Sequence, residues 1–288
     1  MNEPDEPGTE KVVGAGGDGA AAAGGTLRDL VEALDGGRHS EAVALFLSTS
    51  VRAAVPRTKN LLSDVQAAIG ESRANELVAA FASLKCLYCH RGFSRFERCE
   101  GSGRAEVPTD ACLSCSGLGA ARCDFCGGSG LATYNFVPAG LRAAVASVRS
   151  QSAVAQVDKW GGAPFAPARG LGAAAARKAV VEELTKTSRI VAILKNASEL
   201  ALRLRRANPN ARKFTHGLFT RSARGARLAQ IRLAVLHQHL AKLTQAIADA
   251  AEDEQVAAFE RDRAARFMQD GRAIGDAARR RSALFSGR

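Results

Sequence analysis

The residues best suited to do chemistry are seven cysteines, all of them between positions 86 and 126. They fall in four repeats of one short pattern: CLYCHRGF, FERCEGSG, CLSCSGLG and CDFCGGSG. The last two match C-x-x-C-x-G-x-G fully, the first keeps its cysteine pair and Gly92, and the second has Phe96 in place of its first cysteine. Two cysteines separated by two residues can turn both thiolates toward one metal ion, and the glycines let the backbone turn back. The pattern indicates metal binding.

The number of cysteines limits how many metal ions the repeats can hold. A structural zinc ion takes four ligands in tetrahedral geometry, and thiolates are among its preferred ligands. A repeat with two cysteines supplies two ligands, so the repeats must act in pairs, and four repeats imply up to two zinc ions. With seven cysteines, one site can be complete and the other lacks one ligand.

The segment from Cys86 to Gly130 resembles the cysteine-rich zinc-binding domain of DnaJ (Hsp40) co-chaperones and of their relatives without a J-domain. The resemblance implies a small zinc-stabilised β-hairpin module in which the first repeat shares a zinc ion with the fourth, and the second with the third. Because of Phe96, the second site is then one ligand short. The implied zinc ligands are Cys86, Cys89, Cys123 and Cys126 in the first site, and Cys99, Cys112 and Cys115 in the second.

The spacing of the repeats also allows a pairing in which neighbouring repeats close on each other. The complete site would then consist of Cys112, Cys115, Cys123 and Cys126, and His90 could complete the defective site. In the pairing that the resemblance implies, the missing ligand could be a water molecule or one of three carboxylates, those of Glu97, Glu100 and Asp110.

The resemblance implies a protein that holds non-native polypeptides and has the Hsp70 system as a candidate partner. The chain contains no His-Pro-Asp tripeptide, which marks a J-domain, and no pattern of a β-sandwich client-binding domain. Phosphate loops, Gly-x-Ser-x-Gly elbows and His-Glu-x-x-His motifs are also missing from the sequence. We therefore expect a zinc-binding, J-domain-less DnaJ-like protein that is not an enzyme and acts as a chaperone-like protein or a protein-binding adaptor.

Three other interpretations stay open at this point. The C-x-x-C pairs, especially Cys112 and Cys115, could cycle between thiol and disulfide, as in a thiol-disulfide oxidoreductase or isomerase. The basic C-terminal helices could bind RNA or a ribosome as a scaffold. Zinc could also serve only to join two helical domains. The sequence does not indicate an oligomeric state.

The N-terminal sequence and the cysteine count favour a reducing compartment. The first 17 residues, MNEPDEPGTEKVVGAGG, have neither the apolar run of a secretory signal nor an arginine-rich presequence. An odd number of cysteines also argues against a closed set of disulfides. We expect a cytoplasmic protein without a membrane span, because no run of about 18 apolar residues occurs.

Composition and charge predict a mainly α fold, with helical regions on both sides of the cysteine module. Alanine is abundant, and aromatic residues make up only 5% of the chain, which favours helices over sheets. The formal net charge of +11 divides into −4 for residues 1–138 (13 basic, 17 acidic) and +15 for residues 139–288 (27 basic, 12 acidic). The basic half is the part that could attract RNA or acidic proteins.

We expect five segments along the chain. They are a disordered Gly/Ala-rich tail at 1–25, a small helical domain at 26–85, a DnaJ-type zinc-binding module at 86–131, a short helix and Gly/Pro linker at 132–175, and a basic helical hairpin or bundle at 176–288.

The N-terminal domain should contain four short helices. Thr26 and Asp29 form a capping-box-like pair at the start of the first, and Gly36 follows its end. The four expected apolar stripes are Leu27, Leu30, Val31 and Leu34; Val43, Ala44 and Leu47; Leu61, Leu62, Val65 and Ile69; and Leu77, Phe81 and Leu84.

The C-terminal region shows two long apolar stripes of helical period, one at Ile190, Ile193, Ala197, Leu200 and Leu204, the other at Leu233, Leu236, Leu240, Leu243 and Ile247. Two such helices should pack as an antiparallel pair around the break ANPNARKFTHGLFTRSARG. Its tip would carry the cations Arg205, Arg206, Arg212, Lys213, Arg221, Arg224 and Arg227. A third helix should pack on the pair through Val256, Phe259, Phe267 and Ile274.

Four further side chains have expected positions. Trp160 and Phe165 should anchor the linker by packing on the helices. His237 and His239 are two residues apart and so point to different faces of a helix, where we expect surface or rim positions rather than a metal site.

Overall fold

The structure is a computed structural model that describes residues 25–55, 60–107, 109–160, 165, 170–208 and 212–286. The expected tail at 1–25 lies, except for Gly25, outside these residues. The described chain is mainly helical, as the composition predicted. It also contains one two-stranded antiparallel sheet. Among the described helices, none combines the length and the apolar character needed to span a bilayer.

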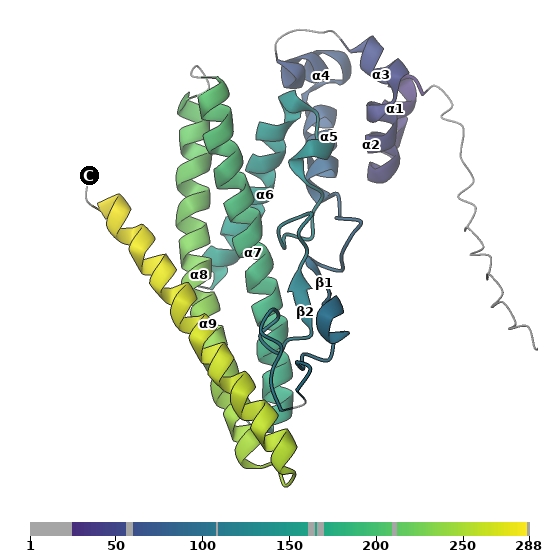
Figure 1. Ribbon diagram of the computed structural model, residues 1–288. Helices are drawn as coiled ribbons and strands as arrows, with labels where there is room; N and C mark the ends of the chain where they lie inside the picture. Colours follow the sequence, from purple (N-terminus) through teal and green to yellow (C-terminus); the bar gives the residue numbers. More distant parts are fainter. Residues whose placement is uncertain are drawn as a thin grey trace, which may run out of the picture.

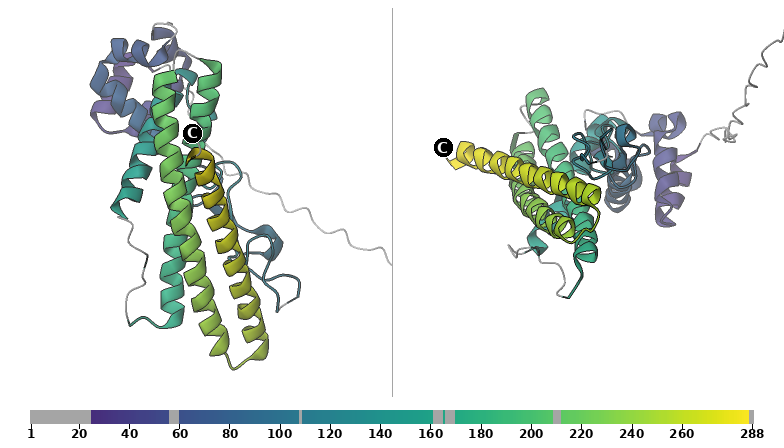
Figure 2. Two further views of the ribbon diagram at one scale, coloured as in Figure 1. Left: turned by 90° about the vertical axis from the view of Figure 1, so that its left-hand side faces the viewer. Right: turned by 60° about the horizontal axis from the view of Figure 1, so that its bottom comes forward.

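The elements follow the chain in this order: α1 (Leu27–Asp35), α2 (His39–Leu47), α3 (Thr49–Ala54), α4 (Leu61–Ile69), α5 (Glu71–Ser83), β1 (Phe93–Arg95), η1 (Glu97–Cys99), β2 (Ala120–Arg122), η2 (Tyr134–Phe136), η3 (Ala139–Leu141), α6 (Arg142–Lys159), α7 (Ala173–Ala207), α8 (Arg212–Asp249) and α9 (Glu254–Ser286). The three longest helices run along one side of the molecule (Figure 1). The cysteine segment lies beside the long helices and lower than the N-terminal helices (Figure 1 and the left view of Figure 2).

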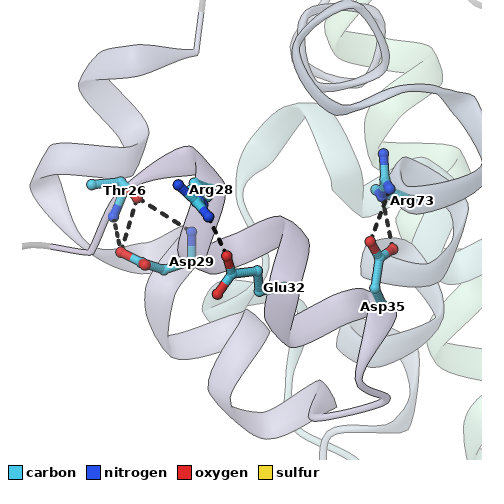
Figure 3. Close-up of polar contacts among 6 residues, drawn as sticks. All are labelled: Thr26, Arg28, Asp29, Glu32, Asp35 and Arg73. Carbon is cyan, nitrogen blue, oxygen red and sulfur yellow. Dashed lines mark hydrogen bonds and ion pairs between the residues drawn. The ribbon is translucent and has the colours of Figure 1, made fainter.

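Helix α1 begins with the capping box that the sequence predicted. The Thr26 hydroxyl accepts a hydrogen bond from the backbone N–H of Asp29 at 3.2 Å, and the Asp29 carboxylate accepts one from the backbone N–H of Thr26 at 2.7 Å (Figure 3). At the end of α1, the Asp35 carboxylate accepts two hydrogen bonds of 2.8 Å from Arg73 of α5. The first and fifth helices are thereby held together.

The N-terminal helices share an apolar core. Phe46 of α2 and Phe81 of α5 meet edge to face, with ring centroids 5.9 Å apart, and Leu30 and Leu77 are fully buried beside them. One predicted stripe was in the wrong register: in α2 the buried residues are Ala42, Val43 and Phe46, whereas Ala44 and Leu47 are exposed. The segment EAVALFL is apolar almost throughout, so its period does not fix the buried face. Helix α3 was not predicted.

Helix α6 joins the two helical regions. The sequence predicted a short helix and a linker here, but α6 has 18 residues. Val145 near its start is buried in the N-terminal core, while Ala153 and Val157 are buried among the long helices. Trp160 and Phe165 pack on the long helices as expected: the Arg232 guanidinium lies over the Trp160 ring, 4.6 Å from its centroid, and 5.7 Å from that of Phe165.

The predicted antiparallel pair is formed by α7 and α8 (Figure 1). Leu194 of α7 and Leu236 and Leu240 of α8 are completely buried between them. The break between the helices was predicted too long, because α8 already begins at Arg212. A proline prevents helix only near its own position, so the break does not extend over the whole basic segment. Arg221, Arg224 and Arg227 therefore lie within α8 rather than at the tip.

Helix α9 packs against α8, as predicted for the third helix. Phe259 and Phe267 are buried and Ile274 is partly buried, but Val256 in the first turn is exposed. The prediction for His237 was wrong: it lies inside the interface between α8 and α9, 6% exposed, with its ring 6.3 Å from that of Phe267. His237 lies on the same buried face of α8 as the apolar stripe, next to Leu236 in sequence.

The buried His237 makes the stability of the bundle dependent on pH. Burial lowers its pKa below the ordinary 6.5, an effect that nearby Arg122 reinforces and Asp270 opposes. Below pH 6.5 the unfolded chain therefore binds more protons than the folded chain. As the pH falls from 6.5 to the pKa of the folded state, the free energy of unfolding decreases by up to about 1.4 kcal/mol per pH unit. We expect His237→Gln to lose this component. Urea unfolding at pH 7.5 and 5.5, followed by Trp160 fluorescence, measures it, and equal pH dependence in both proteins would contradict the assignment.

Candidate metal centre

The two-stranded sheet determines which cysteine repeats meet. Strand β1 follows the first repeat and β2 precedes the fourth, and they pair antiparallel with Phe93 opposite Arg122 and Arg95 opposite Ala120. The ladder is extended by the backbone N–H of Cys123, which donates to the carbonyl of Gly92 at 2.9 Å. The first and fourth repeats therefore lie at one end of the sheet, and the second and third at the other.

The glycines of the repeats are required where backbones approach closely. Gly92 has φ +91°, and a Cβ at this position would stand 2.2 Å from the carbonyl oxygen of Gly128. At the other end of the sheet, a Cβ on Gly103 would stand 2.5 Å from the carbonyl oxygen of Gly117. Neither contact leaves room for a side chain, so both positions require glycine.

The first group contains four cysteines from the first and fourth repeats. The Sγ atoms of Cys86, Cys89, Cys123 and Cys126 all lie within 4.8 Å of one another. The Sγ–Sγ distance is 3.9 Å between Cys86 and Cys123 and 3.7 Å between Cys89 and Cys126. Four sulfur ligands about 2.3 Å from one tetrahedral ion stand about 3.8 Å apart. The group thus has the donors and the spacing to hold a metal ion.

The second group contains Cys99, Cys112 and Cys115, all three buried and also within 4.8 Å of one another. Cys99 and Cys115 have their Sγ atoms 3.8 Å apart, and Phe96 packs against the group. The two groups have the same local design, since the backbone N–H groups of Gly119 and Gly130 each donate to a cysteine Sγ at 3.3 Å.

The structure decides between the two pairings considered from sequence. The local pairing was wrong, because Cys112 and Cys115 lie with Cys99 and not with the fourth repeat. It did not include the β1–β2 ladder, which joins segments far apart in the chain. Among the described residues, no histidine or carboxylate joins either group, so the expected candidates do not complete the second one. These candidates were His90, Glu97, Glu100 and Asp110.

Burial raises the pKa of the cysteine thiols, but hydrogen bonds from backbone N–H groups outweigh it at Cys112 and Cys126 and lower their pKa. At Cys89 and Cys115 burial dominates and raises the pKa to about 12 and about 11. At neutral pH these thiols hold their protons, so an incoming metal ion must displace them. Metal binding should therefore release protons and weaken as the pH falls.

Helices α7 and α9 hold the cysteine module in place. The Asn196 side-chain amide on α7 donates to the carbonyl oxygen of Cys126 at 3.2 Å. On α9, the Asp262 carboxylate accepts a hydrogen bond of 2.8 Å from the backbone N–H of Ala111. These partners are 70 and 151 residues apart in sequence, and no local pattern marks Asn196 or Asp262.

Arg149 of α6 fixes both connections between the module and the helices. Its guanidinium donates to the carbonyl oxygens of Phe81 (3.1 Å) and Ala82 (2.9 Å) in the last turn of α5, just before the module. It also donates to the carbonyl oxygen of Ala132, just after the module, at 2.8 Å. Arg149 is one of many arginines, and sequence reasoning did not single it out.

Several large apolar side chains of the module point into solvent. They are the residues between paired cysteines: Leu87 is 89% exposed, Tyr88 57%, Phe125 62% and Leu113 76%. The rings of Tyr88 and Phe125 stack, with centroids 4.0 Å apart and an interplanar angle of 18°. These four side chains form surface rather than core, which the sequence analysis did not predict.

Searches among protein-family models, curated proteins and solved structures find no match to this chain. The resemblance to the DnaJ cysteine-rich domain therefore depends on the four repeats alone.

Proposed function

We propose that this chain is a zinc-binding, J-domain-less DnaJ-like protein that is not an enzyme and binds partner polypeptides through its cysteine module, as a chaperone-like protein or an adaptor. The observation that carries the proposal is the exposed stack of Tyr88 on Phe125 beside Leu87. Cooperation with an Hsp70 partner belongs to the same proposal.

Zinc is the metal that best suits the first group. Four thiolates at tetrahedral spacing form a closed site, as in structural zinc sites, and leave no position for a substrate. When bound, zinc would supply the cross-link that the module otherwise lacks, because four of its apolar side chains are exposed and contribute nothing to a core.

The exposed aromatic pair depends on the same four cysteines. Tyr88 lies between Cys86 and Cys89, and Phe125 between Cys123 and Cys126. One ion bound by all four cysteines would therefore hold both rings in contact and keep them from folding inward. A rigid exposed aromatic pair loses little entropy on binding, and such anchors dominate the binding energy of many interfaces. Its complement is an apolar stretch of polypeptide.

The test is binding of a permanently unfolded protein, reduced and carboxymethylated α-lactalbumin, to the zinc-loaded chain. We expect the Tyr88→Ser/Phe125→Ser double variant to bind at least about tenfold more weakly, with unchanged zinc content and unfolding midpoint. Phe214→Ser is the matched control, because Phe214 on α8 is 48% exposed and far from the cysteines in sequence. Undiminished binding by the double variant would contradict the proposal, as would a loss in the control of the same size.

RNA binding is the second candidate, supported by the basic end of the α7–α8 hairpin. Four cations close to the connection are all exposed, and Phe214, also exposed, directly follows the last of them. Binding through phosphates must weaken steeply with salt. The four cations are Arg205, Arg206, Arg212 and Lys213. An RNA mobility-shift assay at 50 and 200 mM salt, with charge-reversed variants of these four residues, tests this candidate function.

A further inference from the structure

The second cysteine group differs from the first in having a phenylalanine where the fourth cysteine would stand. In the complete repeats, a glycine N–H donates to the carbonyl of the first cysteine: Gly117 to Cys112 at 3.2 Å, and Gly128 to Cys123 at 3.1 Å. Gly101 makes the same bond to Phe96 at 3.1 Å. The backbone of the second repeat is thus folded like the others, with a phenyl ring in place of a thiol.

Within the part of the chain that the structure describes, no other residue takes the place of the missing ligand. All seven cysteines and all five histidines of the chain belong to the described residues, and none but Cys99, Cys112 and Cys115 joins this group. The Phe96 ring packs against the three cysteines, each at most 7% exposed, and a phenyl ring offers neither a metal ligand nor a hydrogen bond to a bound water. The donor set is therefore three thiolates under an apolar cover, which does not complete a tetrahedral zinc site.

We propose that this second group binds a soft, thiophilic, monovalent metal ion, Cu(I), in trigonal coordination by the three thiolates of Cys99, Cys112 and Cys115. Thiolates are the ligands that Cu(I) selects, and a closed-shell monovalent ion is stable with three of them and no fourth ligand. The apolar cover that removes a ligand for zinc also keeps water from the ion. The two groups of one module would then hold two different metals.

The charges around the second group suit the complex. Cu(I) with three thiolates carries a charge of −2. Arg263 of α9 lies against the third repeat, because a Cβ built on Gly117 would stand 2.8 Å from the Arg263 Cγ atom. The Nε atom of Arg263 is buried and has no hydrogen-bond partner among the described residues. The guanidinium groups of Arg104 and Arg263 both lie over the Phe259 ring, with their Cζ atoms 4.1 and 5.7 Å from the ring centroid.

One carboxylate near the group is shared by two arginines. Glu260 pairs with Arg177 at 2.9 Å and with Arg263 at 3.6 Å, whereas Asp262 pairs with Arg266 at 2.8 Å. Because Glu260 is shared, its charge only partly offsets that of Arg263, and an anionic copper-thiolate complex would add the negative charge that balances it.

The experiment uses the full chain, saturated with zinc, passed over a chelator and titrated anaerobically with Cu(I) against bathocuproine disulfonate. We expect one zinc ion kept and one Cu(I) bound per chain, with three sulfur neighbours in copper X-ray absorption. Cys99→Ser and Cys115→Ser should lose the Cu(I) and keep the zinc. Two zinc ions per wild-type chain, no bound Cu(I), or Cu(I) that displaces the only zinc would overturn the proposal.

Phe96 provides a second test that does not remove a ligand. Phe96→Cys completes a four-cysteine set, so its zinc content should rise from one to two ions per chain. Phe96→Leu, the matched control, keeps an apolar cover and should keep one zinc ion and one Cu(I). A zinc content of one in Phe96→Cys, or of two in Phe96→Leu, would contradict the role given to Phe96. Because metals are counted, the outcome is separate from that of the polypeptide-binding test.

Discussion

Replacing Cys126 by serine is expected to remove the zinc ion and unfold the cysteine module. Cys126 is 2% exposed and is one of the four cysteines of the first group. A structural zinc ion contributes about 10 kcal/mol or more to the folding of a small domain, which is more than any single side-chain contact. We expect the zinc content to fall from one ion per chain to none, measured by mass spectrometry of the metal.

The same variant should separate the module from the N-terminal helices. Their core includes Leu30, Phe46, Leu77 and Phe81 and contains none of the cysteines, so α1 to α5 should stay folded. Hydrogen exchange should show rapid exchange only between residues 86 and 131. Cys115→Ser is the control, because Cys115 belongs to the second group and its loss should leave the zinc ion bound. Zinc that persists in Cys126→Ser would show that the first group is not the zinc site.

Loss of zinc in Cys126→Ser should also abolish polypeptide binding. The stacked rings of Tyr88 and Phe125 come from the two repeats that the first group joins, so unfolding of the module separates them. Binding should fall as far as in the Tyr88→Ser/Phe125→Ser variant, although both rings are still present. This comparison distinguishes a surface assembled by metal from one that needs only two aromatic residues.

Features encoded locally in the sequence could be predicted. The capping box of Thr26 and Asp29 depends on residues three apart, and the stripe from Leu233 to Leu240 on steps of three and four. The repeats indicated directly which residues could hold a metal ion, because their spacing is the chemical requirement itself. The grouping of the first repeat with the fourth followed from the resemblance and not from spacing, which allowed another pairing.

Features that depend on distant partners could not be predicted. Asp262 reaches the module from a helix 151 residues away from Ala111, and its type and neighbours are those of an ordinary exposed helix residue. His237 was expected at a surface or rim position because it and His239 are two residues apart and so lie on different helix faces, whereas its position within the α8 stripe places it inside. In both cases the fold, and not the local sequence, determines the environment.

Replacing Arg149 by methionine is expected to lower the stability of the protein strongly. Arg149 is 7% exposed, and its guanidinium donates three hydrogen bonds, to the carbonyls of Phe81, Ala82 and Ala132. Its Cζ atom lies 5.2 Å from the centroid of the Tyr134 ring. Burial lowers the pKa of Arg149, although an arginine keeps its charge at any physiological pH.

Methionine fills a similar volume but leaves three buried carbonyls without a donor. Each lost bond of this kind costs about 1 kcal/mol or more, so we expect the free energy of unfolding to fall by about 3–5 kcal/mol. Arg142→Met is the matched control on the same helix, because Arg142 makes a single hydrogen bond of 3.0 Å to the Val137 carbonyl and should cost at most about 1 kcal/mol.

Urea unfolding of both variants at pH 7.5, with zinc saturating, measures the difference. The Arg149 side chain donates hydrogen bonds both to the end of α5 and to the segment after Leu131. Its loss should therefore also expose the two junctions of the module to limited proteolysis, near Leu84 and near Ala132. A cost for Arg149→Met no greater than that for Arg142→Met would mean that the metal alone positions the module. The expected larger cost would show that the helices, through Arg149, share that task with the cysteines.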